Sequence, residues 1–451
     1  MTSTARFDII IISLKAIAEK AALGKGGSLL SAGEKMAAKR YTAVKGFRDV
    51  LPPESEAWQR IEEEARELFQ CFGFREVRLP VLEATELFTR SIGESTDIVA
   101  KEMYSFADRK GRSLSLRPEG TASLVRAFLE AGLDQGGPVK LFYSGPMFRY
   151  ERPQKGRFRQ FYQLGCEALG YAGPAVDAEI MAMLRLLFEK LGVTGASLEI
   201  NSLGCRECRP GYREKLVAFL RGKENQLCAD CRRRVEENPL RVLDCKEEKC
   251  RAAVAAAPKA LDSLCEACRS HFQGLQNYLK LFETPYRVNP RIVRGLDYYT
   301  RTAFEYLAED GLGSQNAIAA GGRYDGLVKD LGGPEVPGIG FALGLERLAL
   351  LAPKQVEAEA RLDYFIVYTS EKMREPAFKM LLALRQQGKR VEMYLEEEPK
   401  SLKAQMKLAA KAAPEALIIG EEEFSRKMVK IKEMLTGEEK LVTESKILNL
   451  P

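Results

Sequence analysis

The chain has 451 residues with a formal net charge of +6, and 45% of its residues are hydrophobic and 29% charged. This length exceeds what one hydrophobic core usually holds, so we expect two or three domains. The composition is that of a globular protein, no apolar run approaches the ~20 residues that would span a bilayer, and the mild positive charge permits a nucleic-acid partner without requiring one.

Residues 1–40 form an N-terminal extension with a short apolar run, Ile9 to Ile12. The run is too short and too closely flanked by charges for a secretory signal. Met36 is followed by Ala-Ala-Lys, which is typical of a translation start. We therefore interpret the residues upstream of Met36 as a misassigned start, with a genuine extension as the alternative.

Residues 41–201 contain the first group of predicted elements. Prolines before Glu54 indicate a helix start, apolar residues recur at helical spacing to Phe72, and Gly73 indicates its end. Strands are expected at 74–79, 101–106, 113–117, 140–150, 159–169 and 197–201, with an amphipathic helix at 177–191. This irregular order predicts an antiparallel sheet with helices on one side.

The next segments complete the sheet and add two further units. Residues 202–284 are rich in Cys and Arg and helical in pattern, and they form a predicted insertion between two halves of one sheet domain. Strand patterns return in the second half, 285–355, at 286–293, 302–306 and 317–320. Residues 361–451 alternate strand and helix and end in a hairpin, which predicts a small α/β domain.

Histidine chemistry is limited to one side chain, His271. Any Ser-His-Asp triad, Cys-His pair or His-rich metal site would have to use that residue. Catalysis elsewhere in the chain therefore depends on Arg, Lys, carboxylates, hydroxyls, backbone groups or bound metal.

A basic loop is the first candidate site. From Arg149 to Arg159, both included, the chain has five basic residues and one acidic residue, in the sequence Phe-Arg-Tyr-Glu, a loop, and Arg-Gln-Phe. Two strands joined by such a loop would make a cationic clamp for a polyphosphate, whose reactions depend mainly on positioning and charge neutralisation. A solvated, charged hairpin is the alternative interpretation of this segment alone.

Two further segments are weak signals alone. From Gly338 to Arg347, glycines alternate along a predicted strand that leads into a helix beginning Leu-Glu-Arg. Glycines there let a ligand approach the backbone, although they are also common in packing. Gly73-Phe74 precedes a strand that ends at Pro80, which suits a sheet edge or an interface.

The three segments occur in the order of motifs 1, 2 and 3 of class II aminoacyl-tRNA synthetases, which this chain resembles. The resemblance implies an α+β fold: an antiparallel sheet core flanked by helices, the helical insertion, and a C-terminal α/β anticodon-binding domain. It also implies dimerisation through motif 1 and an ATP site from motifs 2 and 3. In that site, Arg149 would contact the α-phosphate, Arg347 the γ-phosphate, Glu151 would help to place the adenine, and Phe161 would stack on it.

Segments 116–121, 294–299 and 320–326 narrow the resemblance to histidyl-tRNA synthetases of the bacterial type, and 45–49 and 163–167 match the same family. Neutral imidazole offers one donor and one acceptor, so a selective pocket needs a matching pair. By resemblance, Glu167 and Tyr299 contact the imidazole, with Tyr298 beside them. Glu119, Thr121 and Gln163 hold the ammonium group, and Arg294 is the catalytic arginine at the carboxylate and α-phosphate.

The implied reaction has two steps. The histidine carboxylate attacks ATP to give histidyl-adenylate and pyrophosphate, with Mg²⁺ bridging the phosphates, and the 3′ end of tRNA(His) then attacks the activated carbonyl. Arg152 and Gln154 match the residues that meet the acceptor end of the tRNA, whereas Tyr150 departs from the family's frequent His. The expected protein is a cytoplasmic homodimer that does not use a membrane.

The C-terminal domain has one candidate RNA-binding face. Lys403, Lys407 and Lys411 recur every four residues, so they lie on one side of the predicted helix. This face could follow a phosphate backbone, and a plain solvated face is equally compatible with the spacing.

Eight of the ten cysteines form four close pairs in the insertion: Cys205/Cys208, Cys228/Cys231, Cys245/Cys250 and Cys265/Cys268. These spacings are close to those of structural zinc sites, and disulfides are not expected in a reducing cytosol. Incidental thiols without a metal are the alternative interpretation. Two zinc sites, one site with spare thiols, interleaved pairing, and replacement of one sulfur by His271 all remain open.

Other classes are less compatible with the sequence. A non-catalytic histidine-binding regulatory subunit of ATP phosphoribosyltransferase shares the core, but typically lacks the C-terminal domain and loses motif residues that are present here. A synthetase for threonine, proline or glycine would not have the segments at 294–299 and 320–326. A generic RNA-binding protein would not need the glycine strand.

Overall fold

The computed structural model describes residues 41–93, 96–154, 156–309, 312, 316–353, 362–398 and 400–448. The interpretation of residues 1–40 therefore lies outside the described residues. Within these ranges, no helix is both long and apolar enough to cross a membrane.

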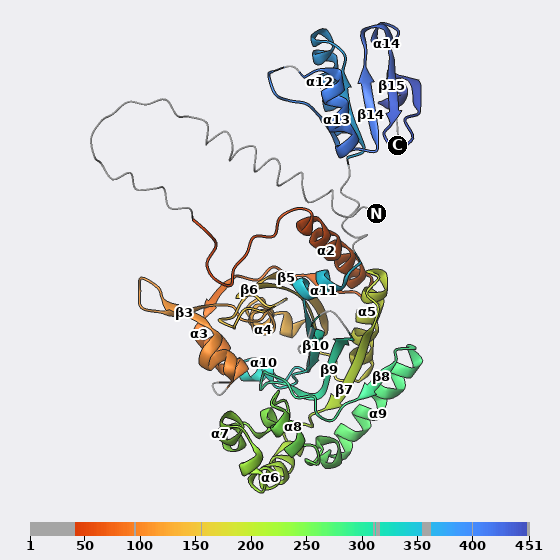
Figure 1. Ribbon diagram of the computed structural model, residues 1–451. Helices are drawn as coiled ribbons and strands as arrows, with labels where there is room; N and C mark the ends of the chain where they lie inside the picture. Colours follow the sequence, from red (N-terminus) through yellow and green to blue (C-terminus); the bar gives the residue numbers. More distant parts are fainter. Residues whose placement is uncertain are drawn as a thin grey trace, which may run out of the picture. The chain divides into compact units, whose positions relative to one another are not determined.

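An eight-stranded sheet is the centre of the first and larger part of the chain (Figure 1). Its order is β1-β5-β6-β11-β10-β9-β7-β8. The five inner pairings are antiparallel, and the two outermost, β1 with β5 and β7 with β8, are parallel. The strands are β1 (Arg75–Glu76), β5 (Val139–Phe148), β6 (Gln160–Leu169), β7 (Ala196–Ser202), β8 (Tyr286–Val288), β9 (Thr300–Ala308), β10 (Ala317–Arg323) and β11 (Gly338–Gly344). The predicted antiparallel sheet core is confirmed.

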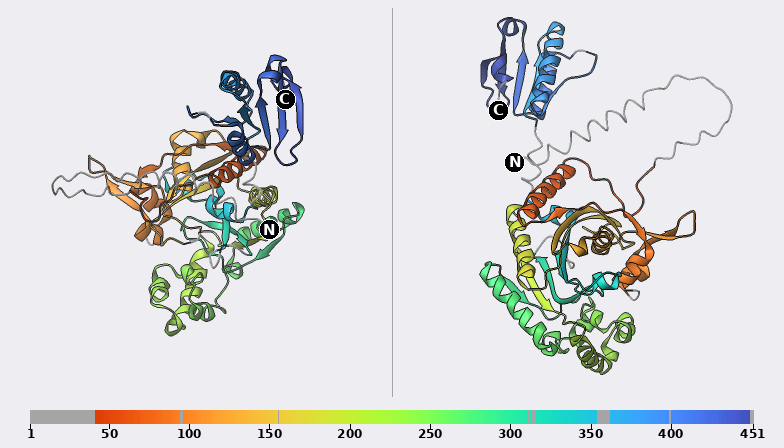
Figure 2. Two further views of the ribbon diagram at one scale, coloured as in Figure 1. Left: turned by 45° about the horizontal axis from the view of Figure 1, so that its top comes forward. Right: turned by 180° about the vertical axis from the view of Figure 1, so that it is seen from behind.

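One face of this sheet is covered by helices α2 (Glu54–Cys71), α5 (Ala175–Lys190), α9 (Glu266–Leu281) and α11 (Leu345–Leu351), as Figures 1 and 2 show. Phe69 of α2 packs edge-to-face on Phe142 and Phe341, and Phe188 of α5 does the same on Tyr306. These rings are buried, and each contributes about 1.5–3 kcal/mol on burial. The face covered by these helices, called the outer face below, therefore holds the main hydrophobic core of the sheet.

The other face curves around α4 (Thr121–Glu130) (Figure 1), with α3 (Thr85–Ile92) and α10 (Leu327–Asp330) beside it. A small sheet of β2 (Leu82–Ala84), β4 (Ser113–Leu116) and β3 (Tyr104–Ala107) is also present. Tyr143, Tyr298, Tyr299 and Tyr324 belong to the core cluster on this face. The inner face therefore combines apolar packing with phenolic hydroxyls.

The insertion between β7 and β8 has a small core of its own. It consists of α6 (Cys208–Arg221), α7 (Ala229–Glu237) and α8 (Glu248–Ala253), with short 3-10 turns η3 (Glu224–Gln226), η4 (Pro239–Val242) and η5 (Ala260–Ser263). Leu216, Val235 and Val242 are fully buried in this core. Helix α9, which follows, packs against α5.

The C-terminal unit is an α/β domain. Its sheet, in the order β13-β12-β14-β15-β16, comprises β12 (Tyr364–Tyr368), β13 (Val391–Met393), β14 (Glu415–Ile419), β15 (Met428–Glu433) and β16 (Glu439–Thr443). Side chains of β12 alternate between the two covering helices: Phe365 clusters with α13 (Leu402–Ala412), and Ile366 with α12 (Arg374–Gln386). The remaining helical segments are η7 (Glu371–Met373), α14 (Glu421–Ser425) and α15 (Glu444–Ile447).

Three predicted strands differ from the observed elements. The strand expected at 74–79 is only β1, because the carbonyls of Leu79 and Pro80 accept hydrogen bonds from the Arg117 guanidinium (2.9 and 3.2 Å). The strand expected at 286–293 ends at Val288, because Asn289 Oδ1 accepts from the Arg291 amide in a turn. The segment at 101–106 begins as the helical turn η1 (Ile98–Glu102) and becomes a strand only at β3.

Candidate active site

Alternation along β6 divides its side chains between the two faces of the sheet. Leu164 and Cys166 enter the core beneath α2 and α5. Phe161, Gln163 and Glu167 have the opposite parity, and Phe161 packs against the inner cluster. A single strand thus supplies three of the predicted site residues to one face.

Glu167 is a buried carboxylate with two hydroxyl donors. Thr121 Oγ1 donates to Oε1 at 2.6 Å, and the Tyr324 hydroxyl donates to Oε2. Its place on the sheet depends on Gly340, because a Cβ there would lie 1.7 Å from Oε2. Burial raises the pKa of Glu167 to about 8, in spite of both hydrogen bonds. The glycine strand therefore makes room for this acid, where the sequence indicated room for a ligand.

Glu119 holds the start of α4. Its carboxylate accepts from the backbone amides of Thr121 (2.7 Å) and Ala122 (2.9 Å), and the Tyr298 hydroxyl lies 3.5 Å from Oε2. Burial raises the pKa of this carboxyl, and the nearby Arg149 charge acts in the opposite direction. Glu119, Thr121, Glu167 and Tyr298 consequently form one connected group.

The Arg294 side chain lies beside the tyrosines of this group. Its Nη1 donates to Glu305 at 2.7 Å, and its guanidinium carbon is 5.0 Å from the centroid of the Tyr299 ring. Nε of Arg294 and Oε1 of Gln163 are buried, and neither has a hydrogen-bond partner among the residues that the structure describes. An amino-acid substrate offers both missing partners: its ammonium group can donate to Gln163, and its carboxylate can accept from Arg294.

Arg149 and Glu151 make the second part of the site. The Arg149 Nε donates to the carbonyl of Pro118 at 2.8 Å, and its guanidinium lies 5.3 Å from the centroid of the Phe161 ring. Glu151 pairs with Arg157 at 2.8 Å and lies 3.8 Å from Arg149. Three members of the basic segment predicted as a cationic clamp, Arg149, Glu151 and Arg157, therefore lie together.

Arg347 lies in the same positive field. Its Nη1 donates to the Ala317 carbonyl at 2.5 Å, and in the described part of the chain no carboxylate lies within 4.0 Å of it. Burial lowers the pKa of Arg347, and the positive charges of Arg157 and Arg149 lower it further. A guanidinium group such as that of Arg347, close to other positive charges and without a carboxylate partner among the described residues, is stabilised by a bound polyanion.

Two predicted site residues lie apart from these groups. Arg152 and Gln154 are exposed on the loop between β5 and β6, where Gln154 and Arg157 exchange backbone hydrogen bonds of 3.1 and 2.9 Å. Tyr150 is half exposed, and its ring lies 3.6 Å from the Arg159 guanidinium. The loop is thus a surface feature next to the clamp.

Sequence reasoning missed two residues that support the site. Tyr324, which bonds Glu167, lies in the quoted 320–326 segment but received no role. Arg323, fully buried, pairs with Asp177 of α5. The single histidine, His271, lies 2.9 Å from the same Asp177 carboxylate, so it joins this structural network and does not replace a cysteine sulfur.

Comparisons with known proteins agree with this geometry. The family model described as histidyl-tRNA synthetase matches residues 46–348, and the anticodon binding domain model matches 363–450. The chain belongs to the histidyl-tRNA synthetase family. A histidine–tRNA ligase of Geobacter sulfurreducens is 53% identical over 398 residues, covering 88% of this chain and 95% of the relative. That of Syntrophotalea carbinolica is 50% identical over 398 residues, covering 88% and 94%.

A solved structure extends the likeness to the fold. The apo histidyl-tRNA synthetase of S. aureus has a TM-score of 0.74 and 35% sequence identity, covering 91% of this chain and 99% of that one. The protein is therefore a class II aminoacyl-tRNA synthetase and a histidine–tRNA ligase. The regulatory subunit of ATP phosphoribosyltransferase, the alternative that the sequence allowed, is not favoured.

Proposed function

We propose that histidine is activated by ATP on the inner face of the sheet, at the residues predicted from the sequence. The observation that carries this proposal is the buried Glu167, bonded by Thr121 and Tyr324. Burying a carboxyl is costly unless it has hydrogen-bond partners. Its presence here therefore favours a site that binds a neutral, polar ring over a purely structural core.

The histidine pocket has a part for each end of the substrate. Glu167 and Tyr299 contact the imidazole, and Tyr298 packs beside Tyr299 with ring centroids 4.8 Å apart. The ammonium group is held by the set Glu119, Thr121 and Gln163, of which Gln163 offers a buried acceptor oxygen. An analogue without the ring N–H would leave buried groups unpaired, which makes the selection strong.

The ATP site is the cationic clamp. Arg149 binds the α-phosphate, Arg347 the γ-phosphate, Glu151 helps to place the adenine, and Phe161 stacks on it. The family uses ATP with Mg²⁺. Among the described residues, the sets of three or more side chains close enough to hold an ion consist of cysteines, so the phosphate oxygens would supply most of the ligands for Mg²⁺.

Arg294 serves the chemical step. The histidine carboxylate attacks the α-phosphorus, pyrophosphate leaves, and negative charge increases on the phosphate oxygens. A guanidinium stays charged and binds such oxygens through a rigid fork. The 3′-hydroxyl of the tRNA then attacks the carbonyl of the adenylate and releases AMP.

Histidine-dependent exchange of pyrophosphate into ATP tests this proposal. Arg294→Ala should lower the exchange rate at least ~10², the scale of losing one oriented electrostatic group. Arg287→Ala, an exposed arginine of β8, is the control and should keep the wild-type rate. Near-normal exchange in the Arg294 variant would refute its role.

The tRNA is bound by two separate parts of the chain. Arg152 and Gln154 contact the acceptor end from the exposed loop, and the domain predicted at 361–451 contacts the anticodon. Bases of an anticodon loop are read by splaying and stacking, so this domain needs a surface and not a groove-binding helix. Since the product supplies protein synthesis, we place the enzyme in the cytoplasm.

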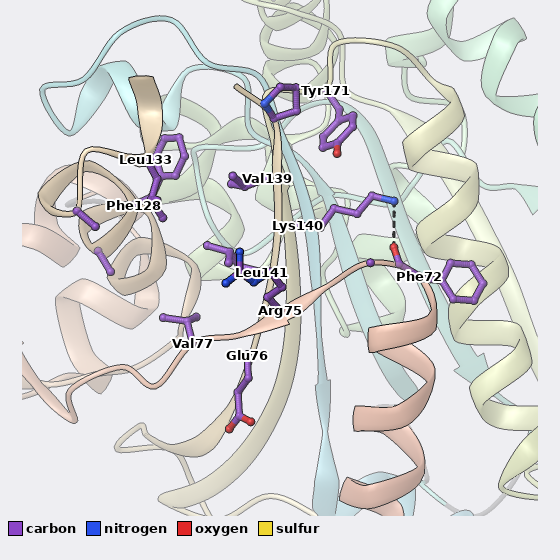
Figure 3. Close-up of a pocket in the computed structure, with 14 residues that line it drawn as sticks. Phe72, Arg75, Glu76, Val77, Phe128, Leu133, Val139, Lys140, Leu141 and Tyr171 are labelled. Atoms are coloured by element: carbon purple, nitrogen blue, oxygen red, sulfur yellow. Dashed lines mark hydrogen bonds between the residues drawn. The ribbon is translucent and has the colours of Figure 1, made fainter. Parts of the chain in front are cut away.

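A homodimer through motif 1 is supported by the edge of the sheet. A surface cavity of about 640 Å³ lies there, lined by the end of α2, by β1, by α4 and by the start of β5 (Figure 3). Phe72, Val139 and Tyr171 give it apolar walls, and Leu133 remains 38% exposed. An unpaired edge strand beside such a cavity suits pairing with a second copy of the chain.

The insertion supplies the remaining cofactor. We propose that its eight paired thiols bind structural Zn²⁺, because thiolates are the preferred ligands of that ion and tetrahedral coordination needs four of them. All ten cysteines are free thiols that form no disulfide, so the sulfur atoms of the insertion are available to a metal.

A further inference from the structure

The cysteines of the insertion gather into two sets with nested pairing. The outer set is Cys205, Cys208, Cys265 and Cys268, and the inner set is Cys228, Cys231, Cys245 and Cys250. Within each set the four sulfur atoms lie within 4.8 Å of one another. The first pair in the sequence therefore joins the last pair, and the two middle pairs join each other.

The spacing of the sulfur atoms fits one tetrahedral ion in each set. In the outer set, Sγ of Cys205 lies 3.6 Å from Cys208 and 3.9 Å from Cys265, and in the inner set Cys228 lies 4.0 Å from Cys245. Four thiolates at ~2.3 Å from Zn²⁺ are about 3.8 Å apart, whereas a disulfide is ~2.05 Å. An iron–sulfur cluster would spread its ligands over several irons, which these sets are too compact to surround.

Backbone amides already point at the sulfur atoms. The Cys265 amide donates to Cys208 Sγ at 3.1 Å, and the Cys228 amide donates to Cys250 Sγ at 3.1 Å. Such donors stabilise thiolates and fix their orientation around a metal. Four thiolates with one Zn²⁺ leave a double negative charge, which these amides help to offset.

The outer set lies where the insertion joins the sheet. Cys205 and Cys208 are at the start of α6, and Cys265 caps α9. Gly204 next to them continues the ladder from β7, because its carbonyl accepts from the Arg301 amide at 2.9 Å. The outer set thus holds the beginnings of both helices against the strand edge that follows Tyr299.

Two arginines, Arg206 in the turn before α6 and Arg209 in α6, reach the segments at 294–299 and 320–326. Arg209 donates a hydrogen bond to the backbone carbonyl of Tyr299. Arg206 binds both oxygens of Asp330 at 2.8 Å and lies over Gly326, where a Cβ would be 2.5 Å from its Nη2. Cys205 and Cys208 are sequence neighbours of these arginines, so the outer set holds the backbone from which both side chains extend.

We propose that the outer set binds one Zn²⁺ ion, that the inner set binds a second, and that the outer ion positions Tyr299 for histidine through Arg209. Arg209 is a positioning residue, since it contacts a backbone carbonyl and not the substrate. The positioning step rests on the proposed function of Tyr299 in imidazole binding. The two metal sites do not depend on that proposed function.

Zinc content tests the nested pairing directly. Wild-type protein purified under reducing conditions should contain two zinc ions per chain. The double variant Cys208→Ser/Cys268→Ser damages only the outer set and should retain one, whereas Cys208→Ser/Cys231→Ser damages both sets and should retain none. If instead the first two pairs formed one site and the last two pairs the other, the first variant would retain no zinc and the second would retain one ion. Cys71→Ser, an exposed thiol of α2, should retain two.

Co²⁺ substitution provides a second measurement that needs no variant. Tetrahedral thiolate coordination gives intense visible absorption, and titration of the metal-free wild type should saturate at two equivalents. Wild-type protein without zinc, or with iron in its place, would overturn the metal assignment. Pyrophosphate exchange in the same samples reports the proposed function separately.

Kinetics of Arg209 variants test the positioning role. Arg209→Ala should keep both zinc ions, raise KM for histidine about tenfold, as expected for losing a charged hydrogen bond, and change KM for ATP less than twofold. Arg209→Lys should restore most of the affinity, because it keeps a donor. Cys208→Ser/Cys268→Ser should raise KM for histidine in the same direction. An unchanged KM for histidine in Arg209→Ala would disprove the positioning role.

Discussion

Glu167 couples the stability of the free enzyme to pH. Its pKa rises from the ordinary 4.5 to about 8 on burial, so the folded state retains a proton that the unfolded state releases. Its contribution to stability is fully present below pH 4.5 and is lost as the pH rises to about 8. Glu167→Gln should remove this dependence.

Urea unfolding between pH 5 and 8.5 would measure the effect. The free energy of unfolding of the wild type should fall relative to that of Glu167→Gln across this range, which follows from the raised pKa. Glu130→Gln, an exposed residue at the end of α4, should follow the wild type. Parallel curves for the wild type and Glu167→Gln would contradict the buried, protonated state.

The sequence identifies a candidate site residue where a motif requires a particular kind of side chain at a particular position. Arg149 and Arg347 could be singled out because polyphosphate chemistry needs fixed cations, and the structure puts both in one positive field. Tyr324 could not, because its hydroxyl acts through contact with Glu167, 157 residues away in the sequence. Such a pairing depends on the order β6-β11-β10 in the sheet.

At the scale of elements, β11 shows why a glycine strand is needed. Gly340 pairs with Glu167 on β6, and a Cβ would lie 1.7 Å from its carboxylate and 2.5 Å from the carbonyl of Cys166. Gly340→Ala must therefore displace either the acid or the strand. We expect a loss of about 1–3 kcal/mol in stability, as for overpacked cores, together with a higher KM for histidine.

Gly344→Ala is the matched control on the same strand. A Cβ at Gly344 would lie 3.7 Å from the nearest side chain, Arg347, which is ordinary contact. Its free energy of unfolding should fall by no more than about 1 kcal/mol, the scale of placing alanine at the N-cap of α11. Equal destabilisation of the two variants in urea unfolding would show that backbone conformation, and not the room for Glu167, selects glycine.

The ends of elements were less predictable than their existence. The hairpin of β15 and β16 and the helix α13 lie within a few residues of the predicted ranges, because hydrophobic periodicity is local. β1 is shorter than predicted because Arg117, from a distant segment, satisfies the carbonyls that a ladder would otherwise bind. Local sequence cannot show such competition.

On the scale of the whole molecule, cysteine pairing depends on the path of the chain. Spacing allowed sequential or interleaved sets, and the nested arrangement exists because α6 and α9 begin side by side. The insertion therefore closes on itself at its two ends. This property could be inferred from the fold but not from the spacing.

Dimerisation is a further property of the whole molecule. Leu133→Glu puts a charge into the apolar cavity at the β1 edge and should weaken self-association at least tenfold, since an unpaired charge buried at an interface is costly. Sedimentation velocity over a concentration series would measure this. Leu281→Glu, at an exposed leucine at the end of α9, should leave the dimer intact. An unchanged dimer in Leu133→Glu would place the interface elsewhere.

The C-terminal domain offers a test that separates tRNA binding from activation. Lys403, Lys407 and Lys411 are all exposed on α13, whereas Gln405 and Ala409 on its other side are buried. If this face follows the phosphate backbone, replacing the three lysines by Gln should raise KM for tRNA and lower the slope of log affinity against log salt by up to about 3, one unit for each lost phosphate contact.

Histidine-dependent pyrophosphate exchange in the triple variant should stay at the wild-type level, because it needs no RNA. Lys379→Gln on α12, another exposed lysine of the domain, controls for the loss of a positive charge elsewhere on its surface. A triple variant with the wild-type salt slope would mean that these lysines form a solvated face and that the domain reaches its RNA through another surface. A drop in exchange would instead mean that the substitutions disturb histidine activation. That result would contradict a role of this face in tRNA binding alone.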